Sequence, residues 1–366
     1  MIDISNELAS KIRMRPLVVT GPPATVTVVI SCFNYGRFLP QAVRSACEQE
    51  GVVVDVIVVD DMSTDDSLSI ARDLERRHSN VSVVAHDHNQ GVVDAFNDGA
   101  RRATGEFVVR LDADDILIPG SLSRATEVAR AYPTVGLVYG HPLHFSGDVL
   151  PRPRLRATGW TIWPGLQWLE DRCQMGKNVI TSPEVVMRNS VLREIGPQAQ
   201  LPHTHDMEYW LRFAAFSDIA YVHGADQAWH REHPASLSAR EVTGEVDLHE
   251  RLMAFTTLFE GPASSIPNAQ GLASMARSAL VTDAIRAARH ELDRGIRESA
   301  LLTACIEFAR ANGQGRQVTW AVRQLEMRAL KNSTSPLSRG SSDMRRLSGR
   351  LKRYAQTQNW HRNGVY

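Results

Sequence analysis

Apolar runs alternate with amphipathic segments along the first 140 residues of the chain. Five nearly continuous apolar runs read as strands buried on both faces of a sheet, at residues 25–31, 54–61, 81–85, 106–115 and 135–140. Helices are predicted between them, at residues 39–50, 63–77, 92–103 and from 121 to just before Pro133. This alternation predicts an α/β fold with a doubly wound, mostly parallel sheet flanked by helices.

The pattern becomes less regular between residues 141 and 240. Residues 180–188 read as a strand, an amphipathic helix begins near Asp206, and residues 228–238 read as a loop. Beyond residue 240 the periodicity indicates a helical extension, with the clearest helices at 273–292 and 298–311. A Ser/Arg-rich tail follows from residue 332.

Composition narrows the class of protein. The 366 residues carry 41 Lys+Arg and 41 Asp+Glu, and this zero net charge argues against a nucleic-acid binder, which needs clustered positive charge. No apolar stretch is long enough for a membrane span, and residues 1–16 lack the apolar core of a secretory signal. The four cysteines are far apart, which argues against disulfides and a cysteine zinc site. We therefore expect a cytoplasmic enzyme.

The strongest candidate for chemistry is the acidic run that ends the fourth strand. If the segment is extended, Asp112 and Asp114 project to the same side because side chains i and i+2 share a face. Two converging carboxylates suit a divalent cation, and their hard oxygens suit Mg²⁺ or Mn²⁺ with substrate phosphates completing the coordination. A solvated acidic turn is the alternative, but the buried strand before these acids favours a site.

A second pair of acids, Asp60 and Asp61, ends the second strand. Helix capping explains the residues that follow, but it does not explain two acids at the exit of a buried strand. A carboxylate here could accept hydrogen bonds from a nucleotide base or ribose. Asp61 is the favoured contact and Asp60 the second choice.

A third candidate begins the amphipathic helix after residue 204. Its apolar positions Met207, Trp210, Leu211 and Ala214 form one face, and Asp206 then lies at the helix amino-terminus, where the dipole favours an ionised carboxylate. Such a group in a cleft could act as a general base, although simple helix capping explains it equally well. Glu208 cannot share that face and is the weaker candidate.

Histidines and tryptophans gather in the same irregular part of the chain. A zinc site at His230 and His233 is disfavoured because the surrounding residues read as a loop and no cysteine joins them. Contact of His233 with a phosphate or metal, or a surface position, both remain open. The three tryptophans Trp160, Trp163 and Trp168 read as core side chains or as an aromatic platform for an acceptor.

In this order, the segments resemble glycosyltransferase family 2, a group of inverting enzymes of the GT-A fold, over about residues 25–238. VTVVISCFNYGRFLPQAVRSACEQ resembles the family's opening strand and helix, VDVIVVDDMSTDDS its acidic nucleotide-binding turn, and NQGVVDAFNDGARRATGEFVVRLDADDILIPGSL the segment ending in the Asp-x-Asp motif. HDMEYWLRF occupies the place of the catalytic-base helix, and HREHPASLS that of a loop ending in His-x-x-Ser.

The resemblance implies a role for each matching residue. Phe33, Asn34, Tyr35 and Asp61 would lie at the nucleotide, Asp112 and Asp114 at a diphosphate-bound Mn²⁺ or Mg²⁺, and His233 and Ser236 over the donor. The family commonly has Glu-Asp at the base, so His205-Asp206 departs at its first position and Asp206 carries the role. The Gln-x-x-Arg-Trp motif of processive synthases is absent from the sequence, which favours single transfer.

The implied enzyme moves a sugar from a nucleotide-diphosphate sugar, with a UDP-sugar favoured, to an acceptor hydroxyl that the sequence does not name. Residues 1–24 would be an extension, 25–140 the nucleotide-sugar-binding half, 141–240 the acceptor-side half, 241–331 a helical region and 332–366 a basic tail. The acceptor could be a saccharide, a natural product or a lipid-linked glycan. The helical carboxy-terminus is a candidate homodimer surface, and residues 347, 351 and 354 of the tail could instead lie on the inner membrane face.

Three other classes of protein are alternatives to this interpretation. A nucleotide-sugar-binding protein without catalysis would carry the same donor contacts. A phosphotransferase can also use Asp-x-Asp, but its nucleophile normally follows the first strand, whereas this motif follows the fourth. A Rossmann dehydrogenase needs Gly-x-Gly-x-x-Gly after the first strand, and residues 31–36 do not supply it.

Overall fold

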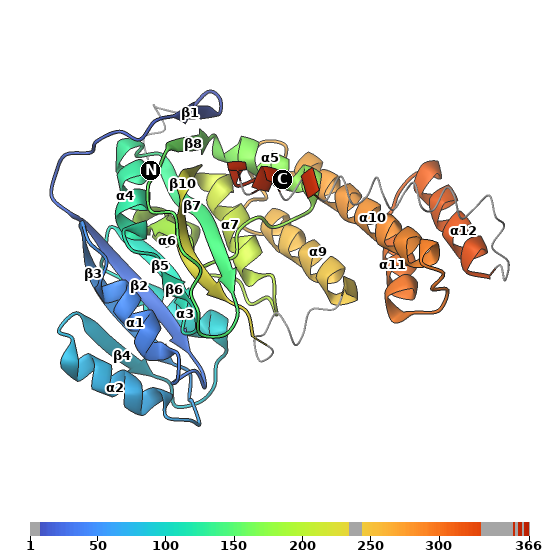
Figure 1. Ribbon diagram of the computed structural model, residues 1–366. Coiled ribbons are helices and arrows are strands. Elements are labelled where there is room, and N and C mark those ends of the chain that lie inside the picture. The colour runs from blue at the N-terminus through green and yellow to red at the C-terminus, as the bar shows by residue number, and fades with distance from the viewer. Residues whose placement is uncertain (1–7, 234–243, 331–353, 356–357, 361, 366) are drawn as a thin grey trace. The chain divides into compact units, whose positions relative to one another are not determined.

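The computed structural model describes residues 8–233, 244–330, 354–355, 358–360 and 362–365 (Figure 1). The chain divides into two compact units. The sheet unit comprises the described residues within Met1–Leu169, Ile180–Gln200 and His205–Pro234. The helical unit comprises those within Glu170–Val179, Leu201–Thr204 and Ala235–Tyr366.

A ten-stranded mixed sheet forms the first unit. Its strands are β1 (Ile12–Met14), β2 (Ala24–Cys32), β3 (Val52–Asp60), β4 (Val81–Ala85), β5 (Phe107–Asp112), β6 (Ile116–Leu117), β7 (Val135–Phe145), β8 (Gly159–Trp163), β9 (Val186–Arg188) and β10 (Asp218–Arg231). Their order is β1-β8-β10-β7-β9-β5-β2-β3-β4, and β6 pairs with β10. Strands β5, β2, β3 and β4 are parallel, as are β7 and β10, whereas β9 runs antiparallel between β5 and β7.

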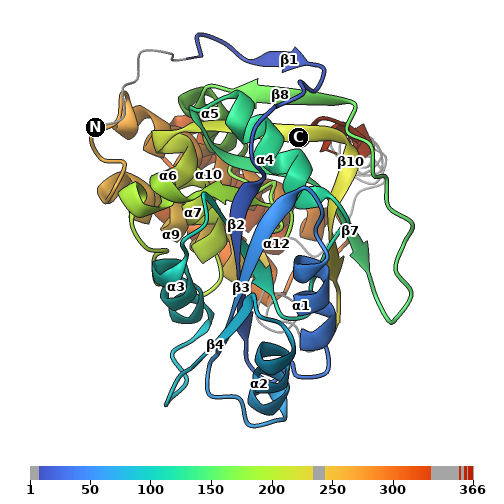
Figure 2. The ribbon, with the colours of Figure 1, turned by 90° about the vertical axis from the view of Figure 1, so that its left-hand side faces the viewer.

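Helices cover both faces of this sheet, as the strand–helix alternation predicts. They are α1 (Leu39–Cys47), α2 (Ser67–Arg77), α3 (Val92–Arg102), α4 (Ser121–Ala131), α6 (Asn189–Ile195) and α7 (His205–Phe216), with α5 (Gly165–Met175) having residues in both units. Figure 2 shows α1 and α2 on one side of β2, β3 and β4, and α3 on the other. The expected α/β fold with a helical carboxy-terminal region is confirmed.

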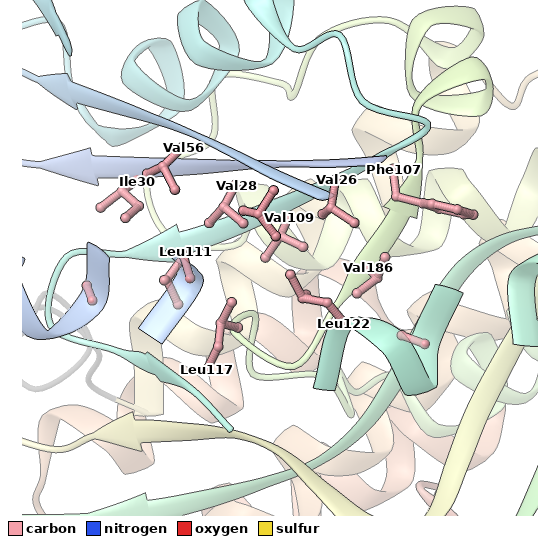
Figure 3. Close-up of a cluster of buried hydrophobic side chains, with 14 of the residues drawn as sticks. Val26, Val28, Ile30, Val56, Phe107, Val109, Leu111, Leu117, Leu122 and Val186 are labelled. Atoms are coloured by element: carbon pink, nitrogen blue, oxygen red, sulfur yellow. The ribbon is translucent and has the colours of Figure 1, made fainter. Parts of the chain in front are cut away.

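Apolar side chains from β2 and β5 form the core on the α1 side (Figure 3). Val26, Val28 and Ile30 alternate along β2 and meet Val109 and Leu111 of β5. All five are buried, and burying an aliphatic side chain of this size contributes about 1.5–3 kcal/mol. This packing fixes β2 and β5 side by side, so the residues that follow them are also neighbours.

On the opposite face, α3 approaches the sheet closely because a glycine stands at the contact. A Cβ added to Gly99 would lie 2.3 Å from Cγ1 of Val29, so any larger residue would push α3 away from β2. Phe96 of α3 also stacks edge-on against Tyr209 of α7, with ring centroids 6.2 Å apart. The α7 helix therefore lies on the α3 side of the sheet.

Two element predictions are wrong in detail. Only Val186–Arg188 of the expected strand 180–188 is extended and paired, because the preceding segment turns at Ser182. Residues 228–231, expected in a loop, end the 14-residue strand β10, which pairs in parallel with β7. The polar histidines and arginine there obscured a strand whose neighbours are not evident in the sequence.

The three tryptophans are core side chains. Trp160 and Trp163 belong to β8, Trp168 lies in α5, and each is at most 1% exposed. Trp160 belongs to the same apolar cluster as β2. An acceptor platform needs an accessible ring face, so core packing is the alternative that the structure supports.

The helical unit consists mainly of α9 (Gly244–Glu260), α10 (Ala269–Asp293), α11 (Ala300–Asn312) and α12 (Arg316–Leu330). Buried residues of α10 and α11 include Leu280, Ala284 and Phe308. No helix in the described part of the chain has the length and apolar character needed to cross a bilayer. Of the tail residues proposed to lie on a membrane, 347 and 351 are outside the described residues.

Candidate active site

Three polar segments meet at one edge of the sheet because they follow adjacent parallel strands. Cys32 at the end of β2 is in register with Asp60 at the end of β3, and Ser31 is in register with Asp112 at the end of β5. Ligands of open α/β sheets bind outside such carboxyl ends. The tertiary structure thus brings together segments 33–36, 61–66 and 113–115.

Asn34 joins the first two of these segments. Its backbone adopts a left-handed conformation with φ of 59°, which asparagine tolerates well. Its side-chain Oδ1 accepts hydrogen bonds from the backbone amides of Thr64 (2.7 Å) and Asp65 (3.3 Å), and its backbone amide donates to the Ser63 hydroxyl (3.0 Å). Asn34 therefore shapes the predicted nucleotide site by holding its two loops together.

Phe33 and Tyr35 flank Asn34 in different surroundings. The Phe33 ring is 44% exposed, which leaves an apolar face beside the strand ends. Tyr35 packs edge-on against the imidazole of His233, with ring centroids 5.6 Å apart. The structure therefore brings the predicted residues Tyr35 and His233 together although 198 positions separate them in the sequence.

Asp61 orders the segment before α3. Its carboxylate accepts hydrogen bonds from the backbone amides of Gln90 and Gly91, both at 2.8 Å, and its Oδ1 lies 2.8 Å from Nδ1 of His86. A carboxylate offers about four acceptor sites, so these three contacts leave room for one more donor group.

Asp60 is less fully engaged than Asp61. Its Oδ2 accepts from the amide of Ser63 (3.2 Å), whereas its buried Oδ1 has no hydrogen-bond partner among the described residues. A buried carboxylate oxygen without a donor is costly, and such atoms often mark a place where a ligand supplies the hydrogen bond. Both acids of this pair are thus candidates for contact with a bound nucleotide sugar.

The Asp-x-Asp motif adopts a turn instead of the expected extended conformation. Strand β5 ends at Asp112, and the amide of Asp115 bonds back to the Asp112 carbonyl at 3.0 Å. The i, i+2 argument for a shared face therefore does not apply. Asp112 is partly exposed and lies 3.5 Å from Nη2 of Arg110, whereas Asp114 is buried.

Asp114 faces His233 across the site. Its Oδ2 lies 2.9 Å from Nε2 of His233. Burial, together with the nearby charges of Asp115 and Asp112, raises the pKa of Asp114 to about 8. A cation bound at this carboxylate would relieve that repulsion and favour the ionised form.

Asp115 is enclosed by the end of β10. Its Oδ1 accepts from the backbone amide of Arg231 (2.8 Å), and its Oδ2 lies 3.1 Å from Nδ1 of His230. Although burial lowers the pKa of His230, the hydrogen bond and charge of Asp115 and the charge of Glu184 raise it to about 9. His230 therefore contacts Asp115 whereas His233 contacts Asp114, and the His230–Asp115 pair was not evident from the sequence.

Arg231 ties the same turn to the surrounding core. Its Nε donates to the Asp114 carbonyl at 3.0 Å, and its guanidinium lies 4.5 Å from the ring centroids of both Phe38 and Phe145. The end of strand β10 thus holds the Asp-x-Asp turn through its backbone carbonyl and through Asp115.

The donor atoms present fit a metal that also binds a ligand's phosphates. No group of three or more His, Cys, Asp or Glu side chains in the described chain is arranged to hold a metal ion alone. Asp114 and His233 nevertheless supply one oxygen and one nitrogen 2.9 Å apart. Mg²⁺ and similar ions are commonly held by one or two carboxylates plus substrate phosphates, and Asp114 supplies such a carboxylate.

Asp206 lies in the first turn of α7, where the amphipathic pattern placed it. Its Oδ1 accepts from the amide of Met207 (2.6 Å), and its Oδ2 accepts from the Ser182 hydroxyl (3.3 Å). The helix amino-terminus favours the ionised carboxylate that a general base needs.

Glu208 has a structural role on the same helix. It is fully buried and paired with Arg212, whose Nε donates to Oε1 at 3.0 Å. Arg212 also donates to the carbonyls of Ile195 and Pro197. A carboxylate enclosed in this way is unavailable to an acceptor hydroxyl, which agrees with its ranking below Asp206.

Ser182 and Glu184 were not evident as site residues from the sequence. Glu184 is 2% exposed, and burial raises its pKa to about 7, although backbone amides of Thr181 and Ser182 oppose the shift. It also contributes to the raised pKa of His230. The available signal was an acid directly before the apolar residues Val185 and Val186. The charge of Glu184 therefore acts on His230, the residue that pairs with Asp115.

Residues 27–196 match the sequence profile of glycosyl transferase family 2. These residues belong to that family. The family 2 domain contains both acidic strand ends, whereas Asp206 and His233 follow it in the chain.

Known proteins resemble the chain in sequence and in fold. An uncharacterized glycosyltransferase of Nostoc sp. is 37% identical over 114 residues, which are 31% of this chain and 35% of the Nostoc protein. The matches span about a third of the length of the first curated relatives.

Solved structures cover more of the chain at lower identity. Residues 1–349 of S. aureus TarS, solved with UDP-GlcNAc, are 14% identical, with a TM-score of 0.58 over 89% of this chain and 92% of that chain. The mannosyltransferase PcManGT from Pyrobaculum calidifontis, solved with GDP-Man and Mn²⁺, is 17% identical, with a TM-score of 0.50 over 88% and 84%. These likenesses show the fold, and the GT-A prediction is confirmed.

Proposed function

We propose that this protein is an inverting glycosyltransferase that moves a sugar from a nucleotide-diphosphate sugar to an acceptor hydroxyl. The observation that carries the proposal is the contact of His233 with Asp114, which follows β5 and lies beside the ends of β2 and β3 in the family 2 domain. A UDP-sugar is the first candidate donor, since the TarS fragment, which has the higher TM-score, was solved with UDP-GlcNAc.

The nucleotide would lie against the ends of β2 and β3. Asp61 is the proposed contact for the base or ribose, and Asp60 offers a second buried oxygen beside it. The exposed Phe33 ring is available to stack on the base, and Asn34 fixes the loop that carries it. These groups bind and orient the donor without taking part in bond breaking.

Asp114 and His233 would hold Mn²⁺ or Mg²⁺ at the donor's diphosphate, with Asp112 next to them on the exposed side. When bound, the metal neutralises charge that develops on the departing diphosphate. Arg231 and His230 keep the acidic turn in place through its carbonyl and through Asp115.

Asp206 would remove the proton from the acceptor hydroxyl as it attacks the anomeric carbon. One base and one direct displacement lead to inversion at that carbon, which is the outcome implied by the family resemblance. The amide of Met207 and the Ser182 hydroxyl orient the carboxylate. The acceptor is not specified by these groups.

A screen of nucleotide sugars tests the proposal. UDP-glucose, UDP-GlcNAc and GDP-mannose would be compared for thermal stabilisation and for slow hydrolysis, each with Mn²⁺ and with EDTA. We expect one donor to stabilise the protein and to be hydrolysed only with metal. Stabilisation without hydrolysis, and without transfer to a panel of saccharides, would favour a catalytically inactive nucleotide-sugar-binding protein instead.

A further inference from the structure

The segment before β9 has an unusual backbone conformation. Ser182 is buried and has a φ of 125°. The other non-glycine residues with positive φ in the described chain are Asn34, Met62 and Asn268, all at 58–59° in the left-handed helical region. Ser182 lies outside that region, in a conformation that residues with a Cβ rarely adopt, so surrounding contacts must hold it there.

Glu184 supplies those contacts. Its Oε1 accepts a hydrogen bond from the amide of Thr181 at 2.6 Å, and its Oε2 accepts one from the amide of Ser182 at 3.1 Å. Pro183, which lies between Ser182 and Glu184, disfavours a helical conformation for Ser182. The amide of Val185 closes the turn by donating to the Ser182 carbonyl at 3.2 Å. A buried carboxylate thus binds both amides on the amino-terminal side of the turn.

The turn directs the Ser182 hydroxyl at Asp206. Oγ of Ser182 donates to Oδ2 of Asp206 at 3.3 Å, while Oδ1 accepts from the amide of Met207. Each carboxylate oxygen therefore has a donor, one from the base's own helix and one from a separate segment. Because φ sets the direction of the Cα–Cβ bond, relaxation of Ser182 to a negative φ would turn its hydroxyl away.

We propose that Glu184 and Ser182 are positioning residues for Asp206: Glu184 holds the strained turn, and the turn supplies the hydroxyl that orients the base. The inference rests on the proposed function, in which Asp206 is the general base. It explains why an acid is buried next to a strained serine at this point of the chain. Orientation matters here because a base displaced by about 1 Å loses roughly 100-fold in rate.

The test uses the full chain and transfer of the sugar to water. UDP-GlcNAc with Mn²⁺ is the donor, or GDP-mannose if the screen selects it. Ser182→Ala removes the hydroxyl, and Ser182→Gly removes the hydroxyl and also accommodates the backbone angle, so at least one variant should fold. Glu184→Gln replaces one amide acceptor by an NH₂ group. Ser190→Ala and Glu194→Gln, both at exposed positions of α6, are the matched controls.

We expect kcat to fall by roughly 10- to 100-fold in the three variants, with the donor KM unchanged and both controls active. The acid limb of the kcat–pH profile should also move to higher pH in both Ser182 variants. The reason is that the Ser182 hydrogen bond favours the ionised form of Asp206, and its loss raises the pKa of that carboxyl. A residue with only a structural role would change the melting temperature and leave this limb in place.

A double-mutant cycle tests whether Ser182 acts on kcat through Asp206 or independently of it. In an Asp206→Asn background, Ser182→Ala should cause no further loss because the group that it orients is already inactive. Normal kcat in both Ser182 variants, or an independent loss in the double mutant, would overturn the positioning role. Normal hydrolysis in Asp206→Asn alone would instead overturn the base assignment in the proposed function.

Discussion

Nε2 of His233 lies 2.9 Å from Oδ2 of Asp114, although 119 positions separate the two residues in the sequence. The contact is made because the turn after β5 and the end of β10 meet, with Arg231 bonded to the Asp114 carbonyl. The pair combines a buried carboxylate of raised pKa with an imidazole nitrogen, which is a donor set suited to a metal shared with phosphates.

From this pair we predict that donor binding requires a divalent cation. Thermal stabilisation by the nucleotide sugar should appear with Mn²⁺ or Mg²⁺ and disappear in EDTA. Asp114→Asn should abolish the metal-dependent thermal stabilisation and most of the activity. It should not lower the melting temperature, because burial next to Asp115 and Asp112 already disfavours the Asp114 charge.

Asp55→Asn, an exposed substitution on β3, is the matched control and should behave as the wild type. Full activity of the wild-type protein in excess EDTA would rule out the metal role.

The second prediction concerns Asp206. Asp206→Asn keeps the size and most hydrogen bonding of the side chain but removes its basicity, so transfer should fall by roughly 10²- to 10⁴-fold. Donor affinity, measured by titration with Mn²⁺ present, should stay nearly unchanged because Asp61 and the Asp-x-Asp motif, and not Asp206, are the proposed donor contacts. Near-normal transfer would contradict the assignment.

Glu208→Gln and His205→Ala are the comparisons for this variant. Glu208→Gln should lower stability, because breaking a buried ion pair typically costs about 3–5 kcal/mol, and any activity loss should follow the unfolded fraction. If either variant loses most of its kcat while its melting temperature stays at the wild-type value, that residue would be the general base instead of Asp206.

The third prediction separates the two acids at the end of β3. Asp61→Asn should weaken donor binding and also lower the free energy of unfolding by about 1–3 kcal/mol. The reason is that one of its buried donors, His86 or the amides of Gln90 and Gly91, loses an acceptor.

Asp60→Asn should leave stability nearly unchanged, since Oδ1 has no partner among the described residues, and should weaken donor binding to a smaller degree. Calorimetric titration and thermal unfolding of both variants measure the difference. Unchanged donor affinity in Asp61→Asn would remove that residue from the nucleotide site.

The fourth prediction concerns pH. The pKa of His230 is raised from its usual 6.5 to about 9, so the folded protein binds this proton more tightly than the unfolded chain does. The resulting stabilisation is fully present below pH 6.5 and is lost as pH rises through 9. The melting temperature of His230→Gln should therefore approach that of the wild type as pH increases from 6.5 to 9.

His88→Gln, at an exposed histidine in the loop before α3, is the control and should not reproduce this convergence. A constant difference between His230→Gln and wild type across the range would show that the histidine carries no such linked proton.

The fold and the strand-end acids were accessible from the sequence for a local reason. Continuous apolar runs report burial on both faces of a strand, and Asp61 and Asp112 come directly after such runs. The amphipathic stripe of α7 likewise placed Asp206 in the first turn of a helix. In each case, the information lies within a few consecutive residues.

Contacts between distant segments were not accessible in this way. Residues 228–231 read as a loop because their pairing partner, β7, is set by tertiary structure. The expected extended Asp-x-Asp segment is a turn because the Asp115 carboxylate is bound by His230 and by the backbone amide of Arg231, both in β10. No periodicity in the sequence encodes either event.

The sequence by itself thus determined the α/β fold, the acids at two strand ends and the helix that carries Asp206, since periodicity and capping depend on neighbours in the chain. Only the tertiary structure decided that the tryptophans are core, that Asp114 faces His233, and that Glu184 holds Ser182 against Asp206. These relations depend on side-chain direction and on packing between segments far apart in the sequence, and both become defined only when the sheet is assembled.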